Sequence, residues 1–227
     1  MDRIEIIQLS ELDAAFGRLG GSVGPRIGAD KRTQDAKEWF VLRRCMGTAL
    51  ATGVFDLPIK IAKAEPPEPD FAAIHGRTHK PALIEITEAT HPDDQREMTE
   101  FARRGKNAIL LGDFGGRFAG GASQPKFVWA SEICDAVLRK QTKSICTRPA
   151  PDRHLVVYPN SNASQLIFDE EDEREAFAHL KEKIDQEHAR YAEALNGCRV
   201  HILGSRLVCL DLARGCRLEP RIGRKPR

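Results

Sequence analysis

The stretch EPPEPDFAAIHGRTHKPALIEITEAT, residues 65–90, decides the expected fold of this chain. Two runs that suit β-strands, FAAIH and ALIEIT, are joined through the turn-forming sequence HGRTHKP, so we expect paired strands here. Asp70 follows a proline at the start of the first strand, and Glu85 lies inside the apolar second one. Burying a carboxylate among apolar residues is costly unless a positive group compensates its charge. The two strands therefore pose the question of what compensates Asp70 and Glu85.

Helical and strand-like patterns alternate along the rest of the chain. Segments with apolar residues at helical spacing are 35–53, a segment that begins at Thr90, 129–146 and 170–196. Strand-like segments, rich in β-branched and other apolar residues, are 54–76, 82–87, 107–114, 154–158 and the hairpin 198–212. Such alternation predicts an α/β protein with a mixed central β-sheet flanked by helices.

The domain organisation is expected to be simple. A length of 227 residues suits one sizeable domain, and the sequence has neither an internal repeat nor a clear linker. We expect a single domain over 1–227 with a core of about 35–213, preceded by a leader, 1–34, and followed by a basic, solvated tail, 217–227. The net charge is only +2, so the overall charge indicates neither a nucleic-acid partner nor a membrane partner.

The cysteines and the amino terminus indicate the cellular compartment. Six cysteines are scattered without a CxxC pair, which favours small buried side chains in a reducing compartment over disulfides or a zinc site. The first residues, MDRIEIIQLSELD, lack the basic start and the long apolar core of a signal peptide. No apolar run approaches the roughly 20 residues that a membrane span needs. We therefore expect a cytoplasmic protein with no membrane partner.

The two acidic residues suggest a metal site. In a strand over 83–87, Glu85 and Thr87 share one face, and Asp70 stands 15 positions before Glu85 with a turn between them. Pairing of the strands would bring the two carboxylates within several ångströms, where they repel each other unless they are protonated or bridged by a cation. Mg²⁺ or Mn²⁺ would bind both carboxylates together with the Ile86 backbone carbonyl. Such an ion lowers the pKa of a bound water and stabilises charge on a phosphate under attack.

The pattern EPDF followed by LIEITEA resembles the signature of the PD-(D/E)XK nuclease superfamily, which has the restriction-endonuclease-like fold. Asp70 matches the first acid of that signature and Glu85 the second, and Glu38 suits the acid that many members carry in their first core helix. The order of expected elements is similar over roughly 35–165, although only about five residues match in identity. The resemblance implies a restriction-endonuclease-like fold and an endonuclease, a metal-binding hydrolase that acts on DNA.

One position departs from the superfamily pattern, because Thr87 occupies the place of the motif lysine. A hydroxyl can hold a water molecule but cannot supply the positive charge that stabilises the transition state. In some members of the superfamily the lysine has moved to a neighbouring helix, and Lys140 is the best candidate here because it lies on the apolar stripe of the helix 129–146, where a lysine is unexpected. Lys143 is the second choice, and Gln95 or Gln141 could position water instead. The alternative is that Lys140 extends its amine to the surface.

Other readings of these residues stay open. Asp70 could cap a turn, and Glu85 could pair with an arginine on an edge strand. His75 and His79 are four positions apart, but they lie in a turn rather than on a helix, so zinc is not expected. The sequence PNSNAS around Ser161 lacks the glycines of a nucleophile elbow, which disfavours a serine hydrolase.

The function that follows is a metal-dependent nuclease that hydrolyses phosphodiester bonds, and DNA is the expected substrate, although the sequence does not distinguish it from RNA. The proposed catalytic residues are Asp70, Glu85 and Lys140, with Glu38 as a further metal ligand through water. The alternative is a nuclease-like fold without catalysis that works as a nucleic-acid-binding or protein-interaction module. Nucleases that cut both strands often dimerise, so a homodimer also remains open.

Overall fold

The structure is a computed structural model, and it describes residues 2–19, 34–90, 125–141, 152–160, 169–195 and 198–222, together with the single positions 96 and 167. The expected strand 107–114 and the helix expected from Thr90 lie outside these residues, apart from Arg96. All statements on structure below concern the described residues.

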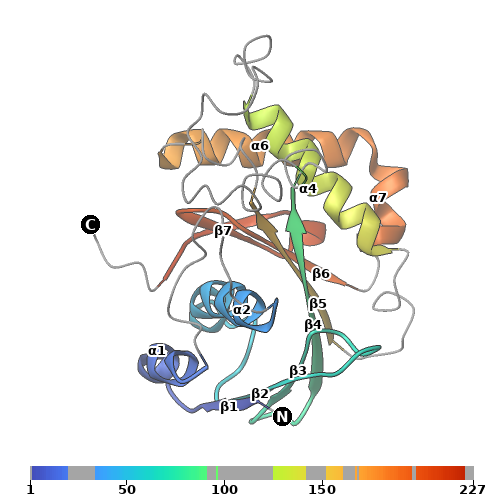
Figure 1. Cartoon of the computed structure of the whole chain (residues 1–227). Helices are drawn as coiled ribbons and strands as arrows, with labels where there is room; N and C mark the ends of the chain where they lie inside the picture. The colour runs from blue at the N-terminus through green and yellow to red at the C-terminus, as the bar shows by residue number, and fades with distance from the viewer. Residues whose placement is uncertain are drawn as a thin grey trace.

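One mixed β-sheet forms the centre of the molecule (Figure 1). Among the described residues it has eight strands, and their order across the sheet is their order in the sequence. The strands are β1 (Arg3–Ile6), β2 (Ile59–Lys63), β3 (Phe71–His75), β4 (Pro81–Ala89), β5 (Asp152–Pro159), β6 (Arg199–Leu203), β7 (Leu207–Leu210) and β8 (Arg217–Pro220). Strands β4, β5 and β6 are parallel, whereas every other pair is antiparallel. The predicted α/β fold with a mixed central sheet is therefore confirmed.

Helices cover both faces of this sheet (Figure 1). On one face lie α1 (Leu12–Gly17) and α2 (Gln34–Ala51), and on the other lie α4 (Pro125–Gln141), α6 (Glu170–Gln186) and α7 (His188–Leu195). Two short 3₁₀ helices, η1 (Leu9–Glu11) and η3 (Leu212–Arg214), complete the described elements. The arrangement explains why β5 is buried over four consecutive residues, since a strand covered on both faces has no polar side.

The two helical layers create two separate hydrophobic cores. Trp39 and Met46 of α2 pack with Ile84 of β4 in the first core, and Ile133 of α4 packs with Val157 of β5 in the second. Because side chains alternate along a strand, even-numbered residues of β4 face α2 and odd-numbered ones face α4. Glu85 and Thr87 therefore belong to the face that α4 covers.

Both ends of the chain contribute more to the fold than the sequence predicts. The expected leader contains β1, which pairs with β2 and buries Ile4 and Ile6, and α1, which buries Phe16. Likewise, residues 217–220 of the expected basic tail form β8, which pairs with β7. Both strands are only four residues long, so each shows too few alternations to stand out as a pattern in the sequence.

The long helix expected over 170–196 is divided in two at Glu187. Its start is as predicted: the Asp169 side chain accepts a hydrogen bond from the Asp172 amide at 2.8 Å, and the first turn is acidic. Phe177, Leu180, Ile184 and Tyr191 remain buried on one side across the break. The apolar stripe thus persists through a kink that its spacing does not reveal.

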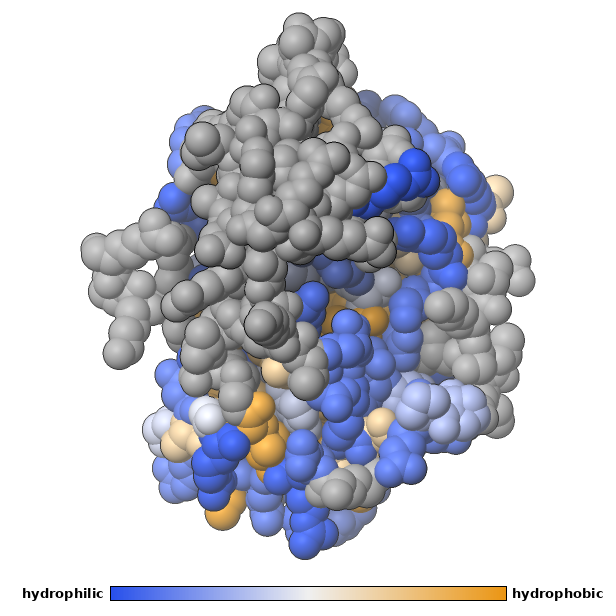
Figure 2. Space-filling model, viewed as in Figure 1, coloured by the Kyte–Doolittle hydropathy of each residue, from blue (hydrophilic) through white to orange (hydrophobic). Residues whose placement is uncertain are grey.

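The described surface in view is mostly hydrophilic and carries only small, separate apolar areas (Figure 2). Exposed large apolar side chains are few and come from different elements: Ile7, Ile74, Phe127, Val128 and Ile222. None of the helices in the described ranges combines the length and the apolar character that crossing a bilayer requires.

Candidate active site

Strands β3 and β4 bring Asp70 and Glu85 together, as the sequence predicts. The antiparallel ladder between these strands ends with the pair Phe71 and Ile84. The next residue outward on each strand is Asp70 on one side and Glu85 on the other. The two acids therefore meet where the ladder opens.

Backbone amides donate a hydrogen bond to each of the two carboxylates. The Asp70 amide donates to Glu85 Oε2 at 3.3 Å, and the Ile86 amide donates to Asp70 Oδ2 at 2.7 Å. In a β-strand the N–H and C=O groups of one residue project to the same edge. Ile86 therefore presents both of its peptide groups to the edge where Asp70 lies.

Lys140 reaches this pair from α4, which packs on β4. Its amine forms an ion pair with Glu85 Oε1, and the two side chains are 17% and 14% exposed. The geometry agrees with the expectation that a lysine on the apolar stripe of this helix points toward the acids rather than toward solvent. The nearly buried ammonium is thus the positive group that compensates Glu85.

The surroundings of Asp70 disfavour the ionised form of its carboxyl group. Burial raises the pKa of its carboxyl above the usual value, and the neighbouring Glu85 raises it further. The Ile86 amide and the ammonium groups of Lys63 and Lys140 act in the opposite direction but do not cancel the rise. Burial is the largest cause of the raised pKa of Asp70, and the neighbouring Glu85 carboxylate is the second.

Glu38 is held by a second lysine that sequence reasoning missed. It is nearly buried on α2, where Oε1 accepts a hydrogen bond from Gln34 Nε2 at 2.8 Å and Oε2 pairs with the Lys63 amine. Lys63 also lies 4.7 Å from the centre of the Phe71 ring and 3.6 Å from Asp35 Oδ1. A signal for this lysine exists in the sequence IKIAK, because Lys63 shares the side of β2 that carries the buried Ile59 and Ile61.

The donor set suits a hard divalent cation in part. The Asp70 and Glu85 carboxylates and the Ile86 carbonyl are oxygen ligands of the kind that Mg²⁺ and Mn²⁺ prefer. The pKa of Asp70 is raised, and a bound cation would stabilise its ionised form. Across the described ranges, however, no three or more His, Cys, Asp or Glu side chains are grouped so that they could hold a metal. The two carboxylates fit such an ion, whereas Glu38 is engaged by Lys63 and is not gathered with them.

The remaining predicted residues are placed as follows. Thr87 lies on β4, partly exposed, two positions after Glu85 and on the same face. Gln95 and Lys143 lie outside the described residues, as do His91, Ser161 and Ser164. Gln141 is the last residue of α4.

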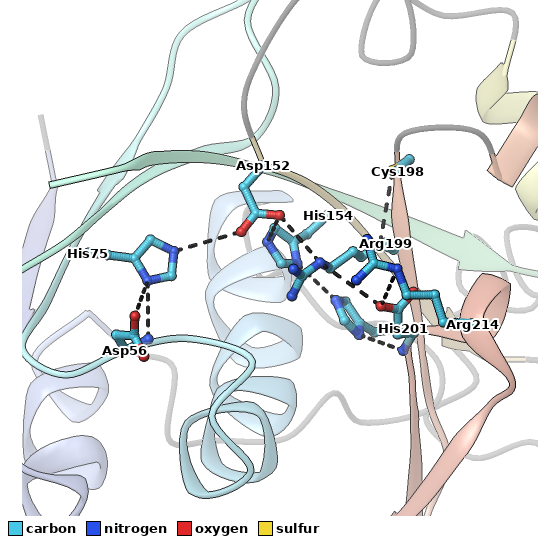
Figure 3. Close-up of polar contacts among 9 residues, drawn as sticks. Asp56, His75, Asp152, His154, Cys198, Arg199, His201 and Arg214 are labelled. Carbon is cyan, nitrogen blue, oxygen red and sulfur yellow. Dashed lines mark hydrogen bonds and ion pairs between the residues drawn. The ribbon is translucent and has the colours of Figure 1, made fainter. Parts of the chain in front are cut away.

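A second polar cluster, which sequence reasoning did not predict, lies near the start of β5 (Figure 3). His75 of β3 and His154 of β5 approach opposite sides of the Asp152 carboxylate, with nitrogen–oxygen distances of 4.0 and 3.2 Å. His154 Nδ1 lies 2.9 Å from His201 Nε2 of β6. His75, His154 and His201 are buried, whereas His79 is exposed.

Backbone donors fix the protons in this cluster. The Asp211 amide donates to His201 Nδ1 at 3.3 Å, and the Asp56 amide donates to His75 Nδ1 at 3.1 Å. Each of these rings therefore carries its proton on Nε2 when it is neutral. The His201 proton then points to His154 Nδ1, which leaves the His154 proton on Nε2, facing Asp152.

The charges of the cluster follow from burial. Burial lowers the pKa of His154 and lowers that of His201 well below the usual value. Burial raises the pKa of Asp152, but the hydrogen bond from His154 and the positive charge of Arg199 outweigh it, so that this pKa lies below the usual value. The lowered pKa values favour the neutral forms of His154 and His201 beside the Asp152 carboxylate.

Comparison with models of protein families, with curated proteins and with solved structures found no match to this chain. The function must therefore be inferred from the residues of the site.

Proposed function

We propose that this protein is a metal-dependent nuclease of the PD-(D/E)XK type that hydrolyses phosphodiester bonds in DNA. One observation carries the proposal: Asp70 just before β3, Glu85 of β4 and Lys140 of α4 meet at one place. Two carboxylates and an ammonium, mostly withdrawn from water, are the groups that phosphoryl transfer requires. A purely structural ion pair would need only one of the two acids.

The two acids would act as the ligand set for Mg²⁺ or Mn²⁺, with the Ile86 carbonyl as a third oxygen donor. Such an ion, when bound, supplies Lewis-acid stabilisation and lowers the pKa of water. Asp70 is suited to this role because its carboxylate is held in place by the Ile86 amide. Glu85 is oriented in the same way by the Asp70 amide.

Lys140 would provide the positive charge that the motif position cannot provide, since Thr87 stands there. Its pairing with Glu85 holds the ammonium beside the acids before substrate arrives, which reduces the reorganisation needed during the reaction. The ammonium then faces the developing charge on the phosphoryl oxygens. The Thr87 hydroxyl, on the same face of β4, is placed to hold a water molecule.

A second candidate function is supported by the same contacts. Glu85 is paired with Lys140, and Asp70 accepts the Ile86 amide, so both acids have protein partners without any metal. A nuclease-like fold without catalysis, which binds nucleic acid or another protein, would show such an arrangement. Metal binding and DNA cleavage separate this candidate from the nuclease.

The test is an assay with supercoiled and linear DNA in Mg²⁺, Mn²⁺ or EDTA. The wild type is expected to cut DNA only with metal, and Glu85→Gln and Lys140→Met are each expected to reduce cleavage by about 100-fold or more. Glu88→Gln is the matched control, because Glu88 is exposed on the same strand and is expected to leave cleavage unchanged.

Full activity of Glu85→Gln would remove the nuclease proposal. Absence of cleavage in every metal, together with no Mn²⁺ binding by calorimetry, would establish the inactive module instead. Circular dichroism of each variant checks that its fold is intact.

A further inference from the structure

Two cysteines lie side by side in the carboxyl-terminal hairpin. Cys209 is in β7 and is paired with Leu218 of β8. Cys216 precedes Leu218 by two positions, so it falls diagonally across from Cys209 on the same side of the hairpin. Cys216 also packs against the hydrophobic core that contains Cys209. Each thiol affects the pKa of the other, as expected for neighbouring side chains.

The two thiols differ in their access to solvent. Cys209 is fully buried, whereas Cys216 is partly exposed. Cys216 ends a turn in which Gly215 and Cys216 both have left-handed backbones, with φ of 112° and 48°. The neighbours Arg214, Gly215 and Arg217 are exposed. A small reagent can therefore approach Cys216 from the side of the turn, but not Cys209.

The surroundings also make Cys216 the more reactive thiol. The hydrogen bond from Cys209 lowers the pKa of Cys216 despite burial, and the ammonium of Lys181 on α6 acts in the same direction. Burial raises the pKa of Cys209. An accessible thiol that readily forms a thiolate beside a second, buried thiol is the arrangement of an attacking and a resolving cysteine.

We propose that Cys209 and Cys216 form a reversible oxidation site that reacts with low-molecular-weight disulfides, such as oxidised glutathione, to close an intramolecular disulfide. This inference is independent of the nuclease proposal, because the hairpin contributes no residue to the site of Asp70 and Glu85.

The reaction proceeds in two thiol–disulfide exchanges. The Cys216 thiolate attacks one sulfur of oxidised glutathione, which forms a mixed disulfide and releases one glutathione thiolate. The Cys209 thiol then loses its proton and attacks the Cys216 sulfur, which releases the second glutathione. Two protein thiols are oxidised to one disulfide, one glutathione disulfide is reduced to two thiols, and the two protons leave with the released thiols.

The other described cysteines provide an internal comparison. Cys45, Cys134 and Cys198 are all buried, and burial raises the pKa of Cys45 to about 12. Thiols of this kind react slowly while the protein remains folded. The folded protein should thus be oxidised first at Cys216, at least about 10-fold faster than at any of these three residues.

The experiment treats the folded full-length protein with oxidised glutathione and maps the products by mass spectrometry after tryptic digestion. Trypsin separates the two cysteines, because Arg214 and Arg217 bound the short peptide that contains Cys216. The expected product is one disulfide between the peptides 207–214 and 215–217, which a reducing agent reverses. Cys209→Ser is expected to stop at the mixed disulfide, with one glutathione on Cys216.

Two results would overturn the proposal: a disulfide that joins other cysteines, or a Cys216 that reacts no faster than the buried thiols. Because Cys209→Ser changes a core residue, the rate comparison is made in the wild type, once folded and once in urea. Preference for Cys216 must be present in the folded protein and lost in urea. Cys216→Ser, at the partly exposed position, must react at none of the three buried cysteines on the same time scale.

Discussion

At the scale of single residues, two lysine–glutamate pairs and Asp70 determine the charge distribution around the site. Lys63 and Lys140 lie on opposite sides of the sheet, and each is paired with a glutamate that is nearly buried, Glu38 and Glu85 respectively. Asp70, between them, is affected by the ammonium groups of both lysines. The acids and lysines thus form one electrostatic group that extends through the sheet, and Lys63 is the member that the sequence analysis did not propose.

Lys63→Met tests this coupling at the position that the sequence did not reveal. The substitution leaves the Glu38 carboxylate without its cation in a nearly buried place, so we expect a loss of about 2–3 kcal/mol in the free energy of unfolding. Urea denaturation at neutral pH measures the change.

The double variant Glu38→Gln with Lys63→Met provides the control. Removing the buried charge together with its partner should cost less than the sum of the two single changes, with a coupling of about 1 kcal/mol or more. Additive effects would show that the ion pair contributes nothing to stability.

The sequence predicts that Asp70 and Glu85 lie together because chemistry and strand register coincide in one segment. The PD and IEIT segments contain the acids and the strands together, and Lys140 is conspicuous as a charge on an apolar stripe. The histidine cluster was missed because its members are far apart in the sequence and become neighbours only through the pairing of β3, β4, β5 and β6. Long-range register of that kind leaves no local pattern.

At the level of elements, the buried carboxylate of Glu173 connects α6 to the β6–β7 turn by hydrogen bonds. Glu173 accepts hydrogen bonds from the amides of Arg206 at 2.9 Å and Leu207 at 3.0 Å, and from that of Ser205. Three donors satisfy a charge that is only 2% exposed. A helix is thus joined to a hairpin through the hairpin's own backbone.

Glu173→Gln should weaken the hydrogen bonds between α6 and the β6–β7 turn. A neutral amide cannot accept three hydrogen bonds as strongly as a carboxylate, so we expect a loss of about 2–3 kcal/mol in the free energy of unfolding. Gly204→Ala should be comparably harmful, because its added methyl group would overlap Glu173 Oε1 and lie 2.7 Å from the Leu207 carbonyl oxygen.

The matched control is Glu171→Gln, on the exposed side of the same helix turn. It should change stability by no more than about 0.5 kcal/mol. Equal effects of Glu171→Gln and Glu173→Gln in denaturant titrations would refute the role of Glu173.

The elements themselves were predicted unevenly, for physical reasons. Helix α2, the β3–β4 pair, β5 and the β6–β7 hairpin have long or regular apolar patterns and follow the prediction closely. Strands β1 and β8 are too short to show alternation, and they exist because neighbouring strands offer them an edge. The break at Glu187 preserves the apolar stripe, so the period alone could not locate it.

For the whole molecule, the histidine cluster predicts how stability depends on pH. The pKa values of His154 and His201 are lowered in the folded state by burial, from an ordinary value of 6.5. Below pH 6.5 the unfolded chain therefore binds protons that the folded chain does not. Stability should fall as the pH drops below this value, by at most about 1.4 kcal/mol per pH unit for each histidine.

Urea denaturation between pH 8 and pH 5 measures this slope. His201→Gln should lower stability at pH 8 and reduce the slope by about half, since one titrating group is removed. A free energy of unfolding that stays constant over this range in the wild type would contradict the neutral, buried state of both rings.

The order of the strands also bears on how the protein is made. Each strand of the described sheet, after the first, pairs with the strand that precedes it in the chain. During synthesis on the ribosome, every new strand therefore emerges after its partner and finds a hydrogen-bonding edge already available. The described part of the sheet can therefore grow one strand at a time in the direction of translation, because each strand after β1 completes a pair as it emerges.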